Sequence, residues 1–492
     1  MSIKGISKSQ FIRGSQCPLN LWFYRNRKDL IPEVDPETQE TFDVGNEIGE
    51  LAQQYFGDGE LITNKYWDID GGIDSTNKCI EAGAEIIFEA TARHPVDGSY
   101  SRIDILKKLP SGKWLLIEVK STTKVKDTHF EDVGFQYHVF NGAGFEIDQC
   151  YLMHVYNEYE RDGDLNIKEL FILEEITECV QDRQEIISQQ IAQLTESASQ
   201  SISPKETIGH KCFSPYQCDF YHHCWKGVPE YSIFNVISKK KAEEVYSLTN
   251  SYEIQDIPEH YLPSGNKRLE INCFLNQQEI YEKELVDDFL SELQYPIHFL
   301  DYETISDAVP MFDKSRPYQQ IPFQYSLHVI EQPGGKIKHK EFLHQETSDP
   351  RLPFILSLIE MIHLSGSILV WNQSFEKACN TGLADAFEEY ADALHGINDR
   401  IVDLMLPFQK RWVYSSKQRG SHSIKAVLPA YFDKSYQDLN IQSGGIASLY
   451  YKHFHKSKFD GDLNSLWSDL YEYCKQDTQS MVDIFQFLEN SK

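Results

Sequence analysis

The chain has 492 residues, of which 41% are hydrophobic and 13% aromatic, and its formal net charge is −28. This length exceeds what one ordinary core can organise, so the sequence predicts two or three domains. The acidic balance argues against a broad surface that coats nucleic acid, and no apolar run is long enough to span a membrane.

The cysteines and the N-terminal stretch indicate a compartment. The first sixteen residues lack the apolar core of a signal peptide, so we expect a cytoplasmic protein. The ten cysteines of such a chain are not expected to form disulfides. Six of them lie scattered among apolar residues and are expected to pack as small hydrophobic side chains: Cys79, Cys150, Cys179, Cys273, Cys379 and Cys474.

The N-terminal part contains a cysteine and three acidic residues of interest. Cys17 precedes a proline and an aromatic run. Glu47 and Glu50 lie on a predicted helix over Thr41–Phe56, and Glu89 lies on an apolar segment. Each glutamate is a candidate metal ligand or an ordinary solvated carboxylate.

Two apolar segments, Tyr100–Leu109 and Lys113–Lys120, predict a β-hairpin with a three-residue loop. This register places Asp104 opposite Glu118, and side-chain alternation places Lys120 on the same face. Two facing carboxylates need a cation between them, so the face predicts a Mg²⁺ site. The alternative is an exposed hairpin with ordinary surface charges.

A helix is predicted over Thr128–Asn141, and it carries Gln136. Together, Asp104, Glu118, Lys120 and Gln136 resemble the core of PD-(D/E)xK nucleases in their RecB-like branch. The resemblance implies a restriction-endonuclease-like fold that hydrolyses phosphodiester bonds with Mg²⁺ or Mn²⁺. That branch usually has a tyrosine four residues after the glutamine, where this chain has Phe140.

A second group of cysteines follows the predicted helix Asp182–Ser197. Cys212, Cys218 and Cys224 are separated by five residues each, a regular spacing typical of metal ligands, and Cys17 can supply the fourth thiolate. This arrangement resembles the iron–sulfur site of RecB-like nucleases of the CRISPR-associated and AddB types. The resemblance implies a [4Fe-4S] cluster that closes a domain over residues 1–228. The alternative is zinc, with a nearby histidine replacing one thiolate: His210, His222 or His223.

Residues 229–292 predict a helical connector, with helices over Lys239–Leu248 and Glu279–Leu293. A new pattern then begins with the apolar strand Ile297–Leu300. Asp301 and Glu303 follow it two residues apart, so both side chains project from one face and can hold a divalent ion. The next predicted elements are strands Phe323–Ile330 and His339–His344, helix Arg351–Leu364, strand Ser367–Trp371, and a helix that begins near Glu376.

A long helix is predicted over Leu463–Leu488, with Tyr473 and Asp477 on one face. In order, Asp301, Glu303, Glu376, Tyr473 and Asp477 resemble the motifs of DEDD exonucleases of the tyrosine-bearing subclass. The resemblance implies an RNase H-like domain over residues 293–492, in which the four acidic residues bind two metal ions and Tyr473 orients the attacking water. The family usually has aspartate where this chain has Glu376. Asp403 is a fallback ligand, and Lys425 is a candidate phosphate contact.

The whole order, from Cys17 to Asp477, also resembles an uncharacterised bacterial family that pairs these two modules. We therefore expect an α/β multidomain DNA nuclease with a RecB-like site and a 3′–5′ exonuclease-like site, acting in repair, recombination or defence. Three alternatives stay open. One half binds nucleic acid without cutting it, the substrate is RNA, or the chain is a non-enzymatic iron–sulfur sensor scaffold.

Overall fold

The computed structural model describes residues 5–491, which fold into two compact units of mixed α/β structure. The first unit comprises the chain up to Val228 together with Ala308–Pro317, and the second comprises Pro229–Asp307 and the chain from Tyr318 onward. Residues 229–292 thus belong to the second unit. Residues 1–4 of the N-terminal stretch in which we looked for a signal peptide lie outside the described residues.

The first unit is built on a six-stranded mixed sheet in the order β1-β2-β3-β4-β5-β6. Its strands are β1 Glu60–Leu61, β2 Ile86–Arg93, β3 Tyr100–Lys108, β4 Trp114–Lys120, β5 Ile147–Val155 and β6 Phe171–Glu175. Its helices are α1 Lys8–Gln16, α2 Pro18–Asn26, α3 Pro36–Phe56, α4 Ile69–Glu81, α5 Asp127–Gly142, α6 Ile167–Leu170, α7 Thr177–Gln181, α8 Gln184–Ser199 and α9 Tyr221–Cys224.

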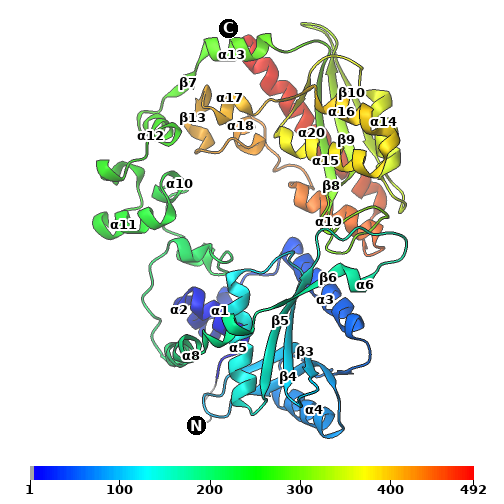
Figure 1. The fold of residues 1–492 in the computed structure, drawn as a ribbon. Coiled ribbons are helices and arrows are strands. Elements are labelled where there is room, and N and C mark those ends of the chain that lie inside the picture. The colour runs from blue at the N-terminus through cyan, green and yellow to red at the C-terminus, as the bar shows by residue number, and fades with distance from the viewer. Residues whose placement is uncertain (1–4, 492) are drawn as a thin grey trace. The chain divides into compact units, whose positions relative to one another are not determined.

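Alternating residues of the central strands fill two separate cores. Leu106 and Leu116 pack on one face of the sheet with Val133 of α5, whereas Ile105 and Ile117 pack on the other face with Ile48 of α3. Figure 1 shows α5 and α3 on opposite sides of this sheet. Glu118 lies on the α5 side, because it has the same parity as Leu116 and Gln136 of α5 donates to its carboxylate.

The second unit contains a five-stranded mixed sheet in the order β10-β9-β8-β11-β12 and a two-stranded sheet of β13 and β7. Its strands are β7 Glu279–Tyr281, β8 Ile297–Ile305, β9 Ile321–Ile330, β10 Ile337–Leu343, β11 Ile368–Val370, β12 Ile401–Asp403 and β13 Val413–Ser415. Its helices are α10 Ile233–Val236, α11 Lys239–Thr249, α12 Asn266–Asn276, α13 Lys283–Ser291, α14 Arg351–Met361, α15 Gln373–Ala386, α16 Ala391–Asn398, α17 Leu406–Gln409, α18 Ile424–Tyr431, α19 Gly444–His455 and α20 Leu463–Asn490.

Helices cover both faces of the five-stranded sheet (Figure 1). Leu300 and Tyr302 of β8 pack with α14, α15 and α16, whereas Phe299 packs with Phe485 of α20. Side-chain alternation along β8 therefore directs Asp301 and Glu303 toward the α20 face. The buried apolar stripe of α20 fixes the helix against that face, and with it the direction of Tyr473 and Asp477.

One predicted element is wrong. The sequence predicts a helix over Glu279–Leu293, but Glu279–Tyr281 form strand β7 and the helix α13 begins at Lys283. Ile280 pairs with Tyr414 of β13, more than one hundred residues later, so a long-range strand pairing overrides the local helical pattern. Among residues 5–491, we find no helix that combines the length and the apolarity needed to cross a bilayer.

Candidate metal centres

The first carboxylate centre lies where β3, β4 and α5 meet. Ile105 pairs with Ile117 and Lys108 with Trp114, which confirms the register predicted from the three-residue loop. The paired residues end at Ile105 and Ile117, one position before Asp104 and Glu118, and the charge of Glu118 acts on Asp104. The Asp104 carboxylate also accepts a hydrogen bond of 2.7 Å from the backbone N–H of Val119, which fixes its orientation.

Both oxygens of Glu118 are engaged, and its side chain is only 2% exposed. Lys120 Nζ lies 2.7 Å from Glu118 Oε1 and 2.5 Å from Asp132 Oδ2. Gln136 Nε2 donates to Glu118 Oε2 over 2.6 Å, so the helix residue predicted to reach this centre does so. The hairpin face is therefore buried and organised, unlike an exposed face with ordinary surface charges. Phe140, in contrast, is fully buried in the apolar core.

Opposite and like charges act on both carboxyl groups of this centre. Burial, followed by the nearby Glu118, raises the pKa of Asp104 well above its usual range. Burial also opposes ionisation of Glu118, but Lys120 and Lys8 outweigh it and lower the pKa of that carboxyl. The pKa of Asp104 and the pKa of Glu118 are thus shifted in opposite directions.

Sequence reasoning missed Lys8 and Asp132 and named Glu89 as one of three candidate glutamates. Lys8 Nζ lies 2.6 Å from Glu118 Oε1, and no local pattern relates two residues 110 positions apart. The charge of Glu89 helps to raise the pKa of Asp104. Glu89 also has a φ of +60°, a conformation that costs a non-glycine residue about 1–3 kcal/mol and that clusters at functional sites. Glu50, a candidate metal ligand on the same helix as Glu47, is exposed.

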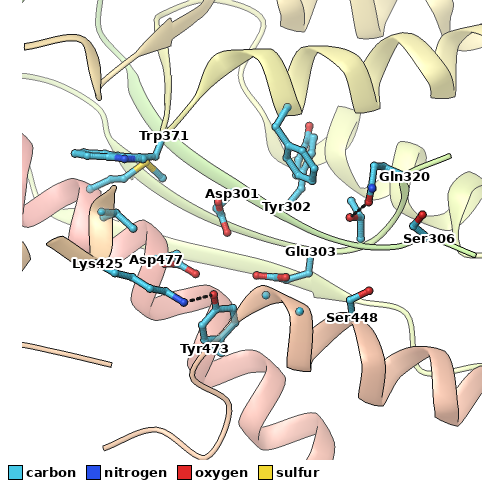
Figure 2. Close-up of a pocket in the computed structure, with 16 residues that line it drawn as sticks. Asp301, Tyr302, Glu303, Ser306, Gln320, Trp371, Lys425, Ser448, Tyr473 and Asp477 are labelled. Carbon is cyan, nitrogen blue, oxygen red and sulfur yellow. Dashed lines mark hydrogen bonds between the residues drawn. The ribbon is translucent and has the colours of Figure 1, made fainter. Parts of the chain in front are cut away.

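The second carboxylate centre is a cavity of about 450 Å³ in the second unit. Asp301 and Glu303 of β8 line it together with Tyr473 and Asp477 of α20 (Figure 2). Lys425 of α18 also lines it, and its Nζ donates to the Tyr473 hydroxyl over 3.2 Å. The three carboxylates thus line one space, although Asp477 follows Asp301 and Glu303 by more than 170 residues in the chain.

Burial dominates the electrostatics of this cavity. It raises the pKa of Asp301 and of Glu303 well above their usual ranges, and Asp477 adds to both effects. Burial likewise raises the pKa of Asp477 to about 6, although hydrogen bonds from Tyr436 and Tyr473 oppose the rise. Tyr436, which sequence reasoning missed, donates to Asp477 Oδ1 over 2.6 Å. Burying three carboxylates in one cavity is costly in free energy unless a cation compensates their charges.

Glu376 and Asp403 take other positions. Glu376 is 1% exposed and one of its carboxylate oxygens lacks a hydrogen-bond partner, but it does not line the cavity. Burial raises its pKa to about 8. Its charge still acts on Asp301, whose pKa it helps to raise. Asp403 accepts hydrogen bonds from the backbone N–H groups of Asn372, Gln373 and Met405, so it caps local structure.

The pKa of Asp477 predicts how the stability of the metal-free protein depends on pH. An aspartate in an unfolded chain has a pKa of about 3.9, and the folded-state pKa of Asp477 is about 6. Between these values the folded state keeps a proton that the unfolded state releases, so the free energy of unfolding should fall as the pH rises from about 4 to about 6. We expect thermal melting in EDTA to show this decline, and a smaller one in Asp477→Asn. Equal declines in both proteins would contradict the prediction.

The four predicted cysteine ligands come together in the first unit. Cys17 directly follows α1, Cys212 ends a short 3₁₀ helix over His210–Cys212, and Cys224 ends α9. Burial raises the pKa of the Cys218 thiol to about 12, and the other three cysteines contribute to this rise. The thiols therefore lie close enough to repel one another as thiolates. His223 packs its ring against Phe23, and His222 packs against Tyr221.

Two further groups of ligand-type side chains occur in the part of the chain that the structure describes. The first consists of His94, Asp97 and His138 in the first unit, and the second consists of Asp301, Glu303 and Cys474. In each group the ligand atoms lie within 4.8 Å of one another. Cys474, predicted only as a packing residue, thus lies against the second carboxylate centre.

The fold and the centres define a class of protein: two mixed α/β units, each with a buried carboxylate centre, and a group of four cysteines in the first. Comparisons give the chain relatives of unknown function. A family model described as a domain of unknown function, DUF2779, matches residues 298–423, which include Asp301, Glu303 and Glu376.

The curated relatives are uncharacterized proteins. MG366 of Mycoplasma genitalium is 27% identical over 215 residues, which cover 39% of this chain and 32% of that protein. UU173 of Ureaplasma parvum is 25% identical over 237 residues, which cover 44% of this chain and 34% of that protein. The match thus spans about a third of each relative. A solved structure titled "Crystal structure of SSO0001" is 11% identical, with a TM-score of 0.25, and covers 46% of this chain and 89% of that chain; a score this low supports no argument.

Proposed function

We propose that this chain is a metal-dependent nuclease that hydrolyses phosphodiester bonds of DNA at two centres. The observation that carries the proposal is the cavity of the second unit, which Asp301, Glu303 and Asp477 line together. Glu303 and Asp477 are buried and Asp301 is partly buried. Three such carboxylates in one cavity are the donor set that Mg²⁺ or Mn²⁺ requires. In this proposal the second unit has an RNase H-like fold and acts as a 3′–5′ exonuclease-like module.

Bound divalent ions would supply Lewis acidity and an activated water at these carboxylates. The chain's own residues do the rest. Burial raises the pKa of Tyr473, so its hydroxyl keeps its proton and can hold the attacking water by a hydrogen bond. Lys425 donates to that hydroxyl and brings a positive charge to the cavity, where negative charge develops during phosphoryl transfer.

The first carboxylate centre would be the other nuclease centre of the chain. In this proposal the first unit has a restriction-endonuclease-like fold. Asp104 and Glu118 are its proposed metal ligands, and Gln136 orients Glu118 by the hydrogen bond between them. Lys120 is held between Glu118 and Asp132, which keeps its ammonium group beside the reacting water. The mixed order of the sheet and the α5 crossover between the parallel strands β4 and β5 support this assignment.

The position of Glu376 favours one alternative. A two-metal centre needs enough ligands on both ions, and Glu376 does not line the cavity. A second unit that binds nucleic acid without cutting it is therefore our second candidate. RNA as substrate and a non-enzymatic iron–sulfur sensor scaffold also remain alternatives, and the same assay distinguishes them.

The test is digestion of end-labelled single-stranded DNA, double-stranded DNA and RNA with Mg²⁺ or Mn²⁺, with EDTA as control. We expect EDTA-sensitive cleavage of DNA. Cleavage of RNA alone would favour the RNA alternative. If no polymer is cut in an EDTA-sensitive way, the nuclease proposal fails and the sensor alternative gains weight.

We further propose that Cys17, Cys212, Cys218 and Cys224 bind a [4Fe-4S] cluster. The other three cysteines lie near enough to help raise the pKa of Cys218. The arrangement of the four also resembles the iron–sulfur site of RecB-like nucleases, and this resemblance favours a cluster over a single zinc ion.

Replacing Cys218 with serine should remove the bound metal and lower the melting temperature, because the site joins the two ends of the first unit. Iron, acid-labile sulfide and zinc would be measured in the purified protein. Cys179→Ser, which changes an exposed cysteine, is the matched control. Zinc without iron would favour the zinc alternative, and an equal metal content in Cys218→Ser and wild type would contradict the site.

A further inference from the structure

Lys8 brings a second ammonium group to the first carboxylate centre. Its Nζ lies 2.6 Å from Glu118 Oε1, the same oxygen that Lys120 contacts at 2.7 Å. The Lys8 side chain is 26% exposed, whereas Glu118 is 2% exposed. Lys8 therefore approaches the buried glutamate from the side of the centre that solvent can reach.

The two lysines differ in their other partners. Lys120 also pairs with Asp132, so it keeps a carboxylate partner when a cation occupies Glu118. The ion pair of Lys8 is with Glu118. When a divalent ion takes that oxygen, the Lys8 ammonium loses this partner and is attracted to an anion near the ion. In a nuclease, that anion is a phosphate of the nucleic acid backbone.

Helix α1 connects Lys8 to the four cysteines. Lys8 is its first residue, Gln16 its last, and Cys17 follows directly. The Gln16 side chain donates to the carbonyl oxygens of Lys211 and Tyr216, at 2.8 and 2.7 Å, on either side of Cys212. Arg13 forms an ion pair with Asp219, next to Cys218.

The helix is short and firmly packed. Nine residues span about 13 Å, and a hydrogen-bonded helix of this length moves as a rigid body. Phe11 is fully buried, with its ring 5.0 Å from that of Phe135 on α5. A change at the cysteine end of α1 is therefore transmitted to the end that carries Lys8.

We propose that Lys8 binds a backbone phosphate of the nucleic acid at the first carboxylate centre, and that α1 makes this contact depend on the four-cysteine group. This proposal rests on the proposed nuclease function. It adds a contact between Lys8 and the substrate, and it makes that contact depend on the four-cysteine group. It assigns to the cysteine group a role in positioning a substrate-binding residue, in addition to closing the domain.

The first test measures the binding of a single-stranded oligonucleotide by fluorescence anisotropy in Ca²⁺ over a range of salt concentrations. Loss of one phosphate contact should reduce the slope of log K against log salt by about 0.7. We expect this reduction in Lys8→Met and a wild-type slope in Lys8→Arg. Lys113→Met is the matched control, because Lys113 is also paired with a carboxylate, that of Asp148, at the opposite end of the hairpin.

The outcomes separate the inference from the function it rests on. If Lys8→Met keeps the wild-type slope, the phosphate contact is overturned, even where cleavage falls, because Lys8 then only positions Glu118. If Lys8→Met binds and cuts like wild type while Lys120→Ala is inactive, the inference fails and the nuclease stands. If wild type neither binds nor cuts the oligonucleotide, both fail.

The second test breaks the connection at the far end of α1. Gln16→Ala removes the two hydrogen bonds to Lys211 and Tyr216, in the loop that contains Cys212. It removes no thiol and leaves the contacts of Glu118 in place. We expect a reduced salt slope with unchanged iron, sulfide and zinc content. Asn26→Ala is the control, since Asn26 also donates to backbone carbonyls, those of Trp22 and Ala198, but outside the cysteine loop. A wild-type slope in Gln16→Ala would overturn the dependence on the cysteine group.

Discussion

Replacing Lys120 with alanine should reduce cleavage by the first centre by at least about 100-fold, because one positioned catalytic group typically contributes 10²–10⁴. Lys120 is held at 2.7 Å from Glu118 and 2.5 Å from Asp132. Its loss removes one of the two ammonium groups at Glu118, which keeps Lys8 and Gln136 as partners. The measurement is the rate at which end-labelled DNA is digested in Mg²⁺ or Mn²⁺.

The same substitution breaks the ion pairs of Lys120 with Glu118 and Asp132, and breaking a buried ion pair can cost about 3–5 kcal/mol of stability. A second variant therefore separates catalysis from folding. Asp104→Asn keeps the size of the side chain and an oxygen that can accept the Val119 hydrogen bond. We expect it to lose the same products while its melting temperature stays near that of wild type. Wild-type cleavage by Asp104→Asn would count against the first centre.

Replacing Asp301 with asparagine should abolish the products of the second centre, with a loss of at least about 100-fold. The physical reason is the removal of a carboxylate that lines the cavity together with Glu303 and Asp477. Although cleavage falls, the stability of the metal-free protein should stay the same or rise. Because burial and the neighbouring carboxylates raise the pKa of Asp301, a neutral amide relieves repulsion in the metal-free protein. We expect an equal or higher melting temperature in EDTA.

Asp399→Asn, which changes an exposed aspartate of the same unit, is the control for charge alone. Distinct product losses in Lys120→Ala and Asp301→Asn, and loss of both patterns in the double variant, would support two active centres. If Asp301→Asn cuts like wild type while Lys120→Ala is inactive, the second unit is a binding module. A lower melting temperature in Asp301→Asn would contradict the repulsion argument.

Short-range patterns were enough to predict the elements that carry the centres. The three-residue loop between β3 and β4 fixes their register as far as the pair Ile105–Ile117, and from this register the sequence predicts Asp104 close to Glu118. The apolar period of α20 likewise places Tyr473 and Asp477 on one face of a long helix. Regular spacing selects Cys212, Cys218 and Cys224 from the ten cysteines, and the resemblance to an iron–sulfur site adds Cys17.

Long-range packing decided the rest. Lys8 reaches Glu118 across 110 residues, and Tyr436 reaches Asp477 across 41. No residue period relates such pairs. The same limit explains the error at Glu279–Tyr281, where a strand partner far along the chain overrode a helical pattern.

The sequence by itself thus determined the mixed α/β class, the register of the central hairpin and most element types, because these depend on side-chain period and loop length. Only the tertiary structure decided which charges share a space. It buried Glu118 between two lysines, brought Lys425 to Tyr473, and left Glu376 outside the cavity lining. Burial and Coulomb interactions depend on distances between segments, and those distances exist only once the chain has folded.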